Sequence, residues 1–143
     1  MASINGIAHM QFTVSNMERS KAFYEPFLHA LEMVTLVDEP EMFYCIGGRT
    51  GLAITPCSAE NSHQSFNQLN VGIHHYCFRA RTRNDVDEIY GIAVKLGANI
   101  IREPAENNEW APGYYSTLFE DPDGIRIEIN HIPGKGHLSG NSA

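Results

Sequence analysis

The chain has little positive charge and no long apolar run. Within its 143 residues, no hydrophobic segment approaches the roughly 18 residues needed to span a bilayer. Only 10 Lys and Arg stand against 17 Asp and Glu, which gives a formal net charge of -7. Because nucleic-acid affinity depends largely on clustered basic side chains, this balance argues against DNA or RNA as a partner. We therefore expect neither membrane insertion nor nucleic-acid binding.

Cysteines are also few, and no targeting signal is evident. Cys45, Cys57 and Cys77 lack the spacing of zinc sites or of redox pairs. The segment Met1 to Gly6 has neither the basic nor the apolar region of a secretory signal. We therefore expect a cytoplasmic protein with reduced thiols. Its length and its 43% hydrophobic residues are typical of one globular domain.

An internal repeat with an offset of 66 residues organises the chain. His9 matches His75 and Phe12 matches Phe78, with no gap needed between the two pairs. The repeat predicts a single domain made of two modules. These are module one at residues 6–56 and module two at residues 72–131, joined by a polar linker at 57–71 and followed by a tail at 132–143.

Each module is predicted to have the order βαβββ, which makes the fold class α+β. Capping-box-like sequences begin the helices at Ser15–Glu18 and Thr82–Asp85, and Pro26 is expected to kink or break the first helix. Asp121–Gly124 predicts a hairpin turn. The expected strands are 7–14, 33–38, 42–46 and 51–55, then 73–80, 99–102, 114–120 and 125–131.

Two histidines and one glutamate are the candidate metal ligands. Strand alternation places His9 and His75 on equivalent faces of the two opening strands. Glu128 lies among alternating isoleucines on the last strand, where Arg126 and Asn130 share its face. A lone strand histidine is usually structural, but a repeated pair plus a carboxylate has the residue types of a facial metal site.

Four stretches resemble the vicinal oxygen chelate superfamily, which includes glyoxalase I, bleomycin and fosfomycin resistance proteins and extradiol dioxygenases. They are His9–Phe12 with Glu18–Tyr24, then His75–Phe78, Leu96–Ala98 and Asp121–Glu128. The resemblance implies a glyoxalase-like fold whose two modules form a cupped mixed β-sheet with helices outside. It also implies a divalent metal on His9, His75 and Glu128, and a homodimer. Glyoxalase I would need a further carboxylate within residues 51–55, and none is present there.

Three protein ligands leave a coordination position open for water or substrate. The sequence therefore predicts a metal-dependent enzyme that acts on a small oxygen-rich molecule by isomerase or lyase chemistry. The ligand types do not choose among Zn, Ni, Mn, Co and Fe. Glu128 is the predicted catalytic residue as a ligand, which leaves the proton-transfer residue unassigned. The alternatives are an extradiol-type dioxygenase and a metal-free small-molecule binding or antibiotic resistance protein.

Four residues are candidates for binding the substrate. Tyr114 and Tyr115 begin a strand beside the proposed site, although either could serve ordinary packing. Arg79 and Arg126 are candidates for holding an anionic substrate. Cys77 shares the face of His75, and we expect it to be a filler without a lowered pKa.

Overall fold

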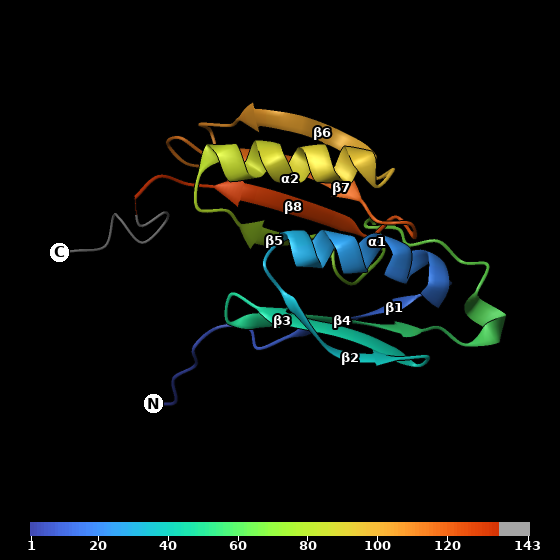
Figure 1. The fold of residues 1–143 in the computed structure, drawn as a ribbon. Coiled ribbons are helices and arrows are strands. Elements are labelled where there is room, and N and C mark those ends of the chain that lie inside the picture. Colours follow the sequence, from blue (N-terminus) through green and yellow to red (C-terminus); the bar gives the residue numbers. More distant parts are fainter. Residues whose placement is uncertain (135–143) are drawn as a thin grey trace. The chain divides into compact units, whose positions relative to one another are not determined.

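The computed structural model describes residues 1–134, and the chain divides into two compact units at Ser65 and Phe66. Each unit contains one four-stranded mixed sheet and one α-helix, as Figure 1 shows. The predicted α+β class with two modules is thereby confirmed. The division falls inside the segment predicted as a linker, which contains one short 3-10 turn, Ala59–Asn61. No helix in the described part of the chain is long and apolar enough to cross a bilayer.

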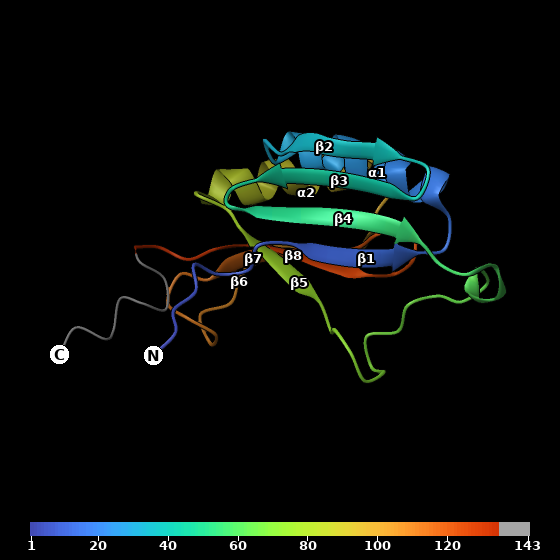
Figure 2. The same ribbon diagram turned by 90° about the horizontal axis from the view of Figure 1, so that it is seen from below.

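Unit 1 is built around the helix α1 and a sheet with the strand order β1-β4-β3-β2 (Figure 2). Strand β1 runs parallel to β4, and the other neighbours are antiparallel. The core of this unit consists of apolar residues of α1 and of the sheet, among them Phe23, Tyr24, Phe27, Leu28, Leu52 and Ile54. The elements are β1 (Met10–Val14), α1 (Met17–Ala30), β2 (Val34–Glu39), β3 (Met42–Gly47) and β4 (Thr50–Pro56).

Unit 2 repeats this plan with the strand order β5-β8-β7-β6, in which β5 is parallel to β8. Helix α2 contacts β6, β7 and β8, so it covers one face of the sheet. Val86, Ala93, Phe119, Ile127 and Ile129 are fully buried in this unit. The elements are β5 (Tyr76–Arg79), α2 (Arg83–Lys95), β6 (Asn99–Glu106), β7 (Tyr115–Glu120) and β8 (Arg126–His131).

The offset of 66 residues holds from the first strand to the start of the helix in each unit, and the later strand connections differ in length. Strands β1 and β5 begin at residues 10 and 76, and helices α1 and α2 begin at residues 17 and 83. Both pairs preserve the offset of 66 residues read from the sequence. The strand connections differ, because β2 and β3 are joined by residues 40–41 while β6 and β7 are joined by residues 107–114. The longer connection carries Trp110 and Tyr114.

Several local expectations differ from the structure, among them the strand predicted at 99–102, which extends to Glu106 as β6. The opening strands were predicted to begin at Ile7 and Ile73 but begin at Met10 and Tyr76. Helix α1 runs through Pro26 without the break that a helical proline suggests. Pro26 is exposed, so the hydrogen bond that it cannot donate is lost on the solvent side, while its buried neighbours hold the helix on the sheet.

The capping box predicted at Thr82–Asp85 and the predicted final turn both form, whereas the capping box predicted at Ser15–Glu18 does not. Thr82 and Asp85 make a full capping box, whereas Asn16 alone caps α1 by accepting from the Arg19 amide at 2.8 Å. In the turn before β8, the Oδ1 atom of Asp121 accepts from the amides of Asp123 and Ile125, both at 2.8 Å. This turn fixes the register in which β8 pairs with β7.

The glycine at position 47 should be essential to the packing of unit 1. A Cβ atom there would lie 2.9 Å from the Met33 Cα and 3.2 Å from the Glu32 carbonyl oxygen, both backbone atoms. We predict that Gly47→Ala lowers the free energy of unfolding by about 1–3 kcal/mol, measured by urea denaturation. Gly91, in α2, has open space around it, so Gly91→Ala should instead add up to about 1 kcal/mol. A neutral Gly47→Ala variant would contradict this packing.

Candidate metal site

The polar face of the unit 2 sheet carries the candidate site. Ile127 and Ile129 on β8 are fully buried, so the residues between and beside them point to the face away from α2. The strand register continues this face across all four strands. In one row of neighbouring positions, Cys77 of β5 pairs with Glu128 of β8, Glu128 with Leu118 of β7, and Leu118 with Arg102 of β6.

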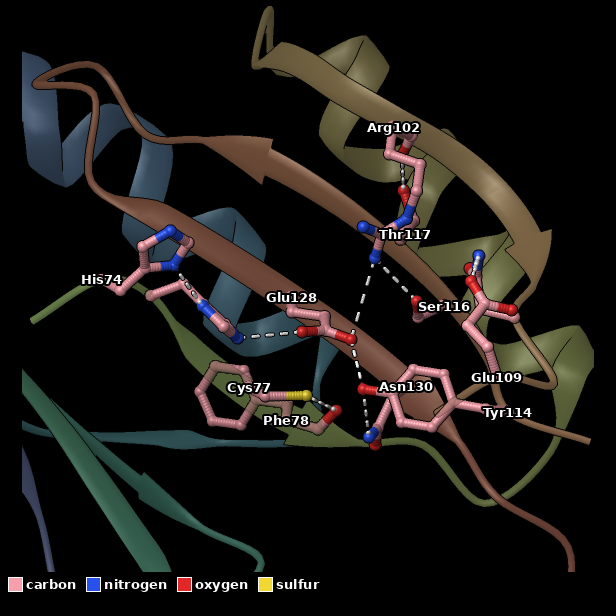
Figure 3. Close-up of polar contacts among 12 residues, drawn as sticks. His74, Cys77, Phe78, Arg102, Glu109, Tyr114, Ser116, Thr117, Glu128 and Asn130 are labelled. Atoms are coloured by element: carbon pink, nitrogen blue, oxygen red, sulfur yellow. Dashed lines mark hydrogen bonds and ion pairs between the residues drawn. The ribbon is translucent and has the colours of Figure 1, made fainter. Parts of the chain in front are cut away.

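Glu128 is the centre of this face and is only 6% exposed. Its Oε2 atom lies 3.0 Å from the Nε2 atom of His75. Its Oε1 atom accepts a short hydrogen bond from the Tyr114 hydroxyl and lies 3.8 Å from Nη2 of Arg102 (Figure 3). The Tyr114 oxygen in turn accepts from the amide of Asn130 at 3.1 Å. Each carboxylate oxygen therefore has its own partner.

His75 is oriented from its other side by a neighbouring histidine. The Nδ1 atoms of His74 and His75 lie 2.8 Å apart, so one of them donates to the other. This contact leaves Nε2 of His75 directed at Glu128. His75 precedes β5 by one residue, and Cys77, two residues further along, pairs with Glu128 across the parallel ladder. The parallel pairing of β5 and β8 thus brings together two side chains that are far apart in the sequence.

The two predicted tyrosines point to opposite faces. Tyr114 is buried, and burial together with its hydrogen bond to Glu128 raises its pKa, so the phenol keeps its proton at neutral pH. Tyr115 donates to Oδ1 of Asp87 at 2.7 Å and lies 4.9 Å below the guanidinium of Arg83, both on α2. Consecutive residues alternate along a strand, which explains why only Tyr114 contacts Glu128.

The two predicted arginines lie at the edges of this face. Arg126 donates from Nε to Oε1 of Glu120 at 3.2 Å, so the charge of Glu120 balances the charge of Arg126. Arg79 is exposed at the end of β5. Among the described residues, neither arginine bonds to Glu128. Arg102, which the sequence did not single out, lies nearer to it.

His9 belongs to unit 1, where it is exposed and precedes β1. Its ring meets the Tyr44 ring edge-on, with centroids 6.2 Å apart. The Tyr44 ring lies over Gly51, where a Cβ atom would be 2.5 Å from it. Within residues 1–134, no three His, Cys, Asp or Glu side chains come together as a metal-binding group. His75 and Glu128 are the pair of predicted ligands that meet within one unit.

His75 and Glu128 supply an imidazole nitrogen and a carboxylate oxygen, both of which are donor types that a divalent ion takes. The 3.0 Å between His75 Nε2 and Glu128 Oε2 is the length of a direct hydrogen bond or ion pair, so an ion held by both atoms would replace this contact. Desolvation by the surrounding chain and the charge of Glu128 raise the pKa of the Cys77 thiol to about 12, so this cysteine is no reactive thiolate at neutral pH. The imidazole and the carboxylate therefore suit a borderline divalent ion.

Comparison with known proteins establishes the family. Residues 6–129 match the model of the Glyoxalase/Bleomycin resistance protein/Dioxygenase superfamily, and the chain belongs to that superfamily. The metallothiol transferase FosB of Shouchella clausii (strain KSM-K16) is 28% identical over 130 residues, which span 89% of this chain and 80% of that protein.

Solved structures show the same fold at lower identity. A glyoxalase candidate from Bacillus halodurans matches with a TM-score of 0.76 and 22% identity, covering 90% of this chain and 96% of that one. Lactoylglutathione lyase from Agrobacterium tumefaciens matches with a TM-score of 0.65 and 20% identity, covering 97% and 99% respectively. The predicted glyoxalase-like fold is thus confirmed.

The hydrogen bond from Tyr114 should contribute to stability because its acceptor is a buried carboxylate. Tyr114→Phe is expected to lower the free energy of unfolding by about 1–3 kcal/mol in the presence of a chelator. Tyr115→Phe is the matched control, since its hydroxyl bonds to Asp87 on the solvent-exposed surface of α2 and should cost less than about 1 kcal/mol. Urea unfolding of both variants would measure the difference, and equal losses would contradict the special role of Tyr114.

Proposed function

We propose that the chain is a divalent-metal-dependent enzyme that acts on a small oxygen-rich molecule by isomerase or lyase chemistry. One observation carries the proposal: a buried glutamate, Glu128, faces the Nε2 atom of an exposed histidine, His75, at 3.0 Å. Buried carboxylates are costly unless they are paired, and they concentrate at functional sites. His9 is proposed as the third ligand on the internal repeat and the family resemblance alone.

The residues around Glu128 have defined parts in this proposal. Tyr114 holds Oε1, which leaves Oε2 as the single oxygen available to an ion. The contact between His74 and His75 fixes the direction of the imidazole. A bound Zn, Ni, Mn, Co or Fe ion would supply Lewis-acid polarisation of a substrate oxygen. Tyr114 is proposed to position Glu128 through its hydrogen bond to Oε1.

The relatives support metal chemistry on a small molecule. One curated relative is a metallothiol transferase, and one structural neighbour is a lactoylglutathione lyase. The transferase relative makes group transfer to or from a thiol a second candidate, because its identity extends over 89% of the chain. An extradiol-type dioxygenase and a metal-free binding or resistance protein remain proposals that the experiments below separate.

We also propose a cytoplasmic homodimer. The described chain has three free cysteines, which suits a reducing compartment. The edge strand β2 carries two exposed apolar side chains, Val34 and Leu36, which are 61% and 59% exposed and which a second copy would cover. Light scattering of the purified protein tests the dimer directly.

A metal titration tests the proposed site. We predict one Co²⁺ ion per chain, followed by its visible absorption. His75→Ala, Glu128→Gln and His9→Ala should each weaken binding by more than the roughly 10- to 100-fold that loss of an outer partner costs. His63→Ala, an exposed histidine in the segment between the strands β4 and β5, should leave the affinity unchanged. A wild-type protein that binds no ion, or a His75→Ala variant with wild-type affinity, would refute the proposal.

The alternatives predict different outcomes in the same preparation. Consumption of O₂ with a catechol by the Fe(II)-loaded protein would favour the dioxygenase. Small-molecule binding that survives complete removal of metal would favour the metal-free protein. Turnover only with a divalent ion, without O₂, favours isomerase, lyase or thiol-transfer chemistry.

A further inference from the structure

A second feature of the polar face is the arginine on the edge strand β6. Arg102 and Glu128 both pair with Leu118, from opposite sides, so the arginine lies two strands from the glutamate. Its side chain reaches across β7, where Nη2 donates to Oγ of Ser116 at 2.8 Å and lies 3.8 Å from Oε1 of Glu128 (Figure 3). The guanidinium therefore ends beside the proposed metal ligand.

The backbone around Arg102 is shaped to direct this side chain. The pairing of β6 with β7 shifts register on both sides of Arg102, between Ile100 and Arg102 and again between Arg102 and Ala105. The Thr117 hydroxyl donates to the Arg102 carbonyl at 2.8 Å. Such bulges redirect side chains and are frequent next to active sites. The position of the guanidinium is thus built into the sheet.

Trp110, on the long connection between β6 and β7, packs its ring against the guanidinium of Arg102. The Trp110 ring lies 5.0 Å from the Cζ atom of Arg102, within the range of a cation–π contact. The same ring meets the Tyr114 ring edge-on at 5.2 Å. Residues 107–114 therefore fix the arginine and the tyrosine beside Glu128 together.

Arg102 retains hydrogen-bonding capacity that the protein does not use. Its Nε atom is buried and has no partner among the described residues, while 27% of the side chain is exposed, so a ligand would contact the guanidinium through its Nη groups. A guanidinium has five N–H donors, and its planar fork matches the geometry of an oxyanion. Arg126 on the same face is ion-paired with Glu120 at 3.2 Å, a closer contact than the 3.8 Å between Arg102 and Glu128. Arg102 is thus the better placed of the two to contact a ligand.

The charges around Glu128 indicate when an anion would bind. Arg102 and Glu128 cancel each other, and so do Arg126 and Glu120. A ligating histidine is neutral, so a divalent ion on His75 and Glu128 would leave the site with net positive charge. An anionic group would then bind between the ion and Arg102.

We propose that Arg102 forms an oxyanion subsite, and that the substrate is a small acid whose anionic group lies next to the oxygen that ligates the ion. This inference rests on the proposed function, because it needs the ion to be bound. Trp110 supports the guanidinium from the loop and acts as a positioning residue. The subsite selects for a negatively charged substrate by a charge-assisted hydrogen bond.

The test compares glycolate with glycolamide, which carry the same hydroxyl but differ in charge. Both are titrated into the full-length Co²⁺-loaded protein at constant ionic strength, and binding is followed by the change in visible absorption. Wild-type protein should prefer glycolate. Arg102→Gln should weaken glycolate binding by about 10- to 100-fold and change glycolamide binding less than about twofold. Arg102→Lys, which keeps the charge but loses the fork, should give an intermediate loss.

Arg83→Gln is the matched control, because it removes an equal charge from α2, on the other face of the same sheet, and should change glycolate binding less than about twofold. Equal effects of Arg102→Gln and Arg83→Gln, or no preference for glycolate, would overturn the subsite. Loss of Co²⁺ affinity in both Arg102 variants would also overturn it, since Arg102 would then support the metal ligands. If wild-type protein binds no Co²⁺, the proposed function itself fails, which separates the two outcomes.

Discussion

The arrangement of unit 2 depends on one buried carboxylate, Glu128, and on the groups that contact its two oxygens. Glu128 is 6% exposed in a strand whose neighbouring residues are isoleucines, so its charge must be satisfied within the protein. His75 and Tyr114 each take one of its oxygens. The apolar residues of the same strand pack against α2, and this packing keeps the carboxylate on the opposite face. Strand β8 thus contributes Ile127 and Ile129 to the core on one face and Glu128 to the candidate site on the other.

The two units share one plan but differ in the connection between their second and third strands. Both units begin with the same strand and helix at a constant offset, but only unit 2 has the long connection at residues 107–114. That connection supplies Tyr114 to Glu128 and Trp110 to Arg102. The corresponding turn of unit 1 consists of residues 40–41 and has no room for such side chains. The contacts around Glu128 therefore depend on a loop that unit 1 does not have.

Much of the fold could be predicted from the sequence, because the repeat and the strand alternation are strong local signals. They located both helices, all the later strands to within a few residues and the turn at Asp121. Alternation did not show that His75 and Glu128 face each other, which only the family resemblance implied, and the joint role of these residues with His9 is a proposal. The sequence does not show where β7 begins, so it does not show which of Tyr114 and Tyr115 faces Glu128. In the structure Tyr114 bonds to Glu128 and Tyr115 bonds to Asp87.

Arg102 was missed for a physical reason. Two register shifts surround it, so simple alternation along β6 does not give the direction of its side chain. Its contacts with Ser116 and Glu128 follow from the pairing of β6 with β7 and of β7 with β8, which the sequence alone does not give. The continuity of α1 through Pro26 depended in the same way on packing, which holds the helix where the local sequence suggested a break.

The most direct test of the central claim is anomalous scattering from a crystal of the protein grown with Co²⁺. We expect an anomalous peak within bonding distance of His75 Nε2 and of one oxygen of Glu128, with the second oxygen still accepting from Tyr114. A structure in which the ion lies elsewhere, while His75 and Glu128 keep their direct contact, would contradict the assignment of this carboxylate as a metal ligand.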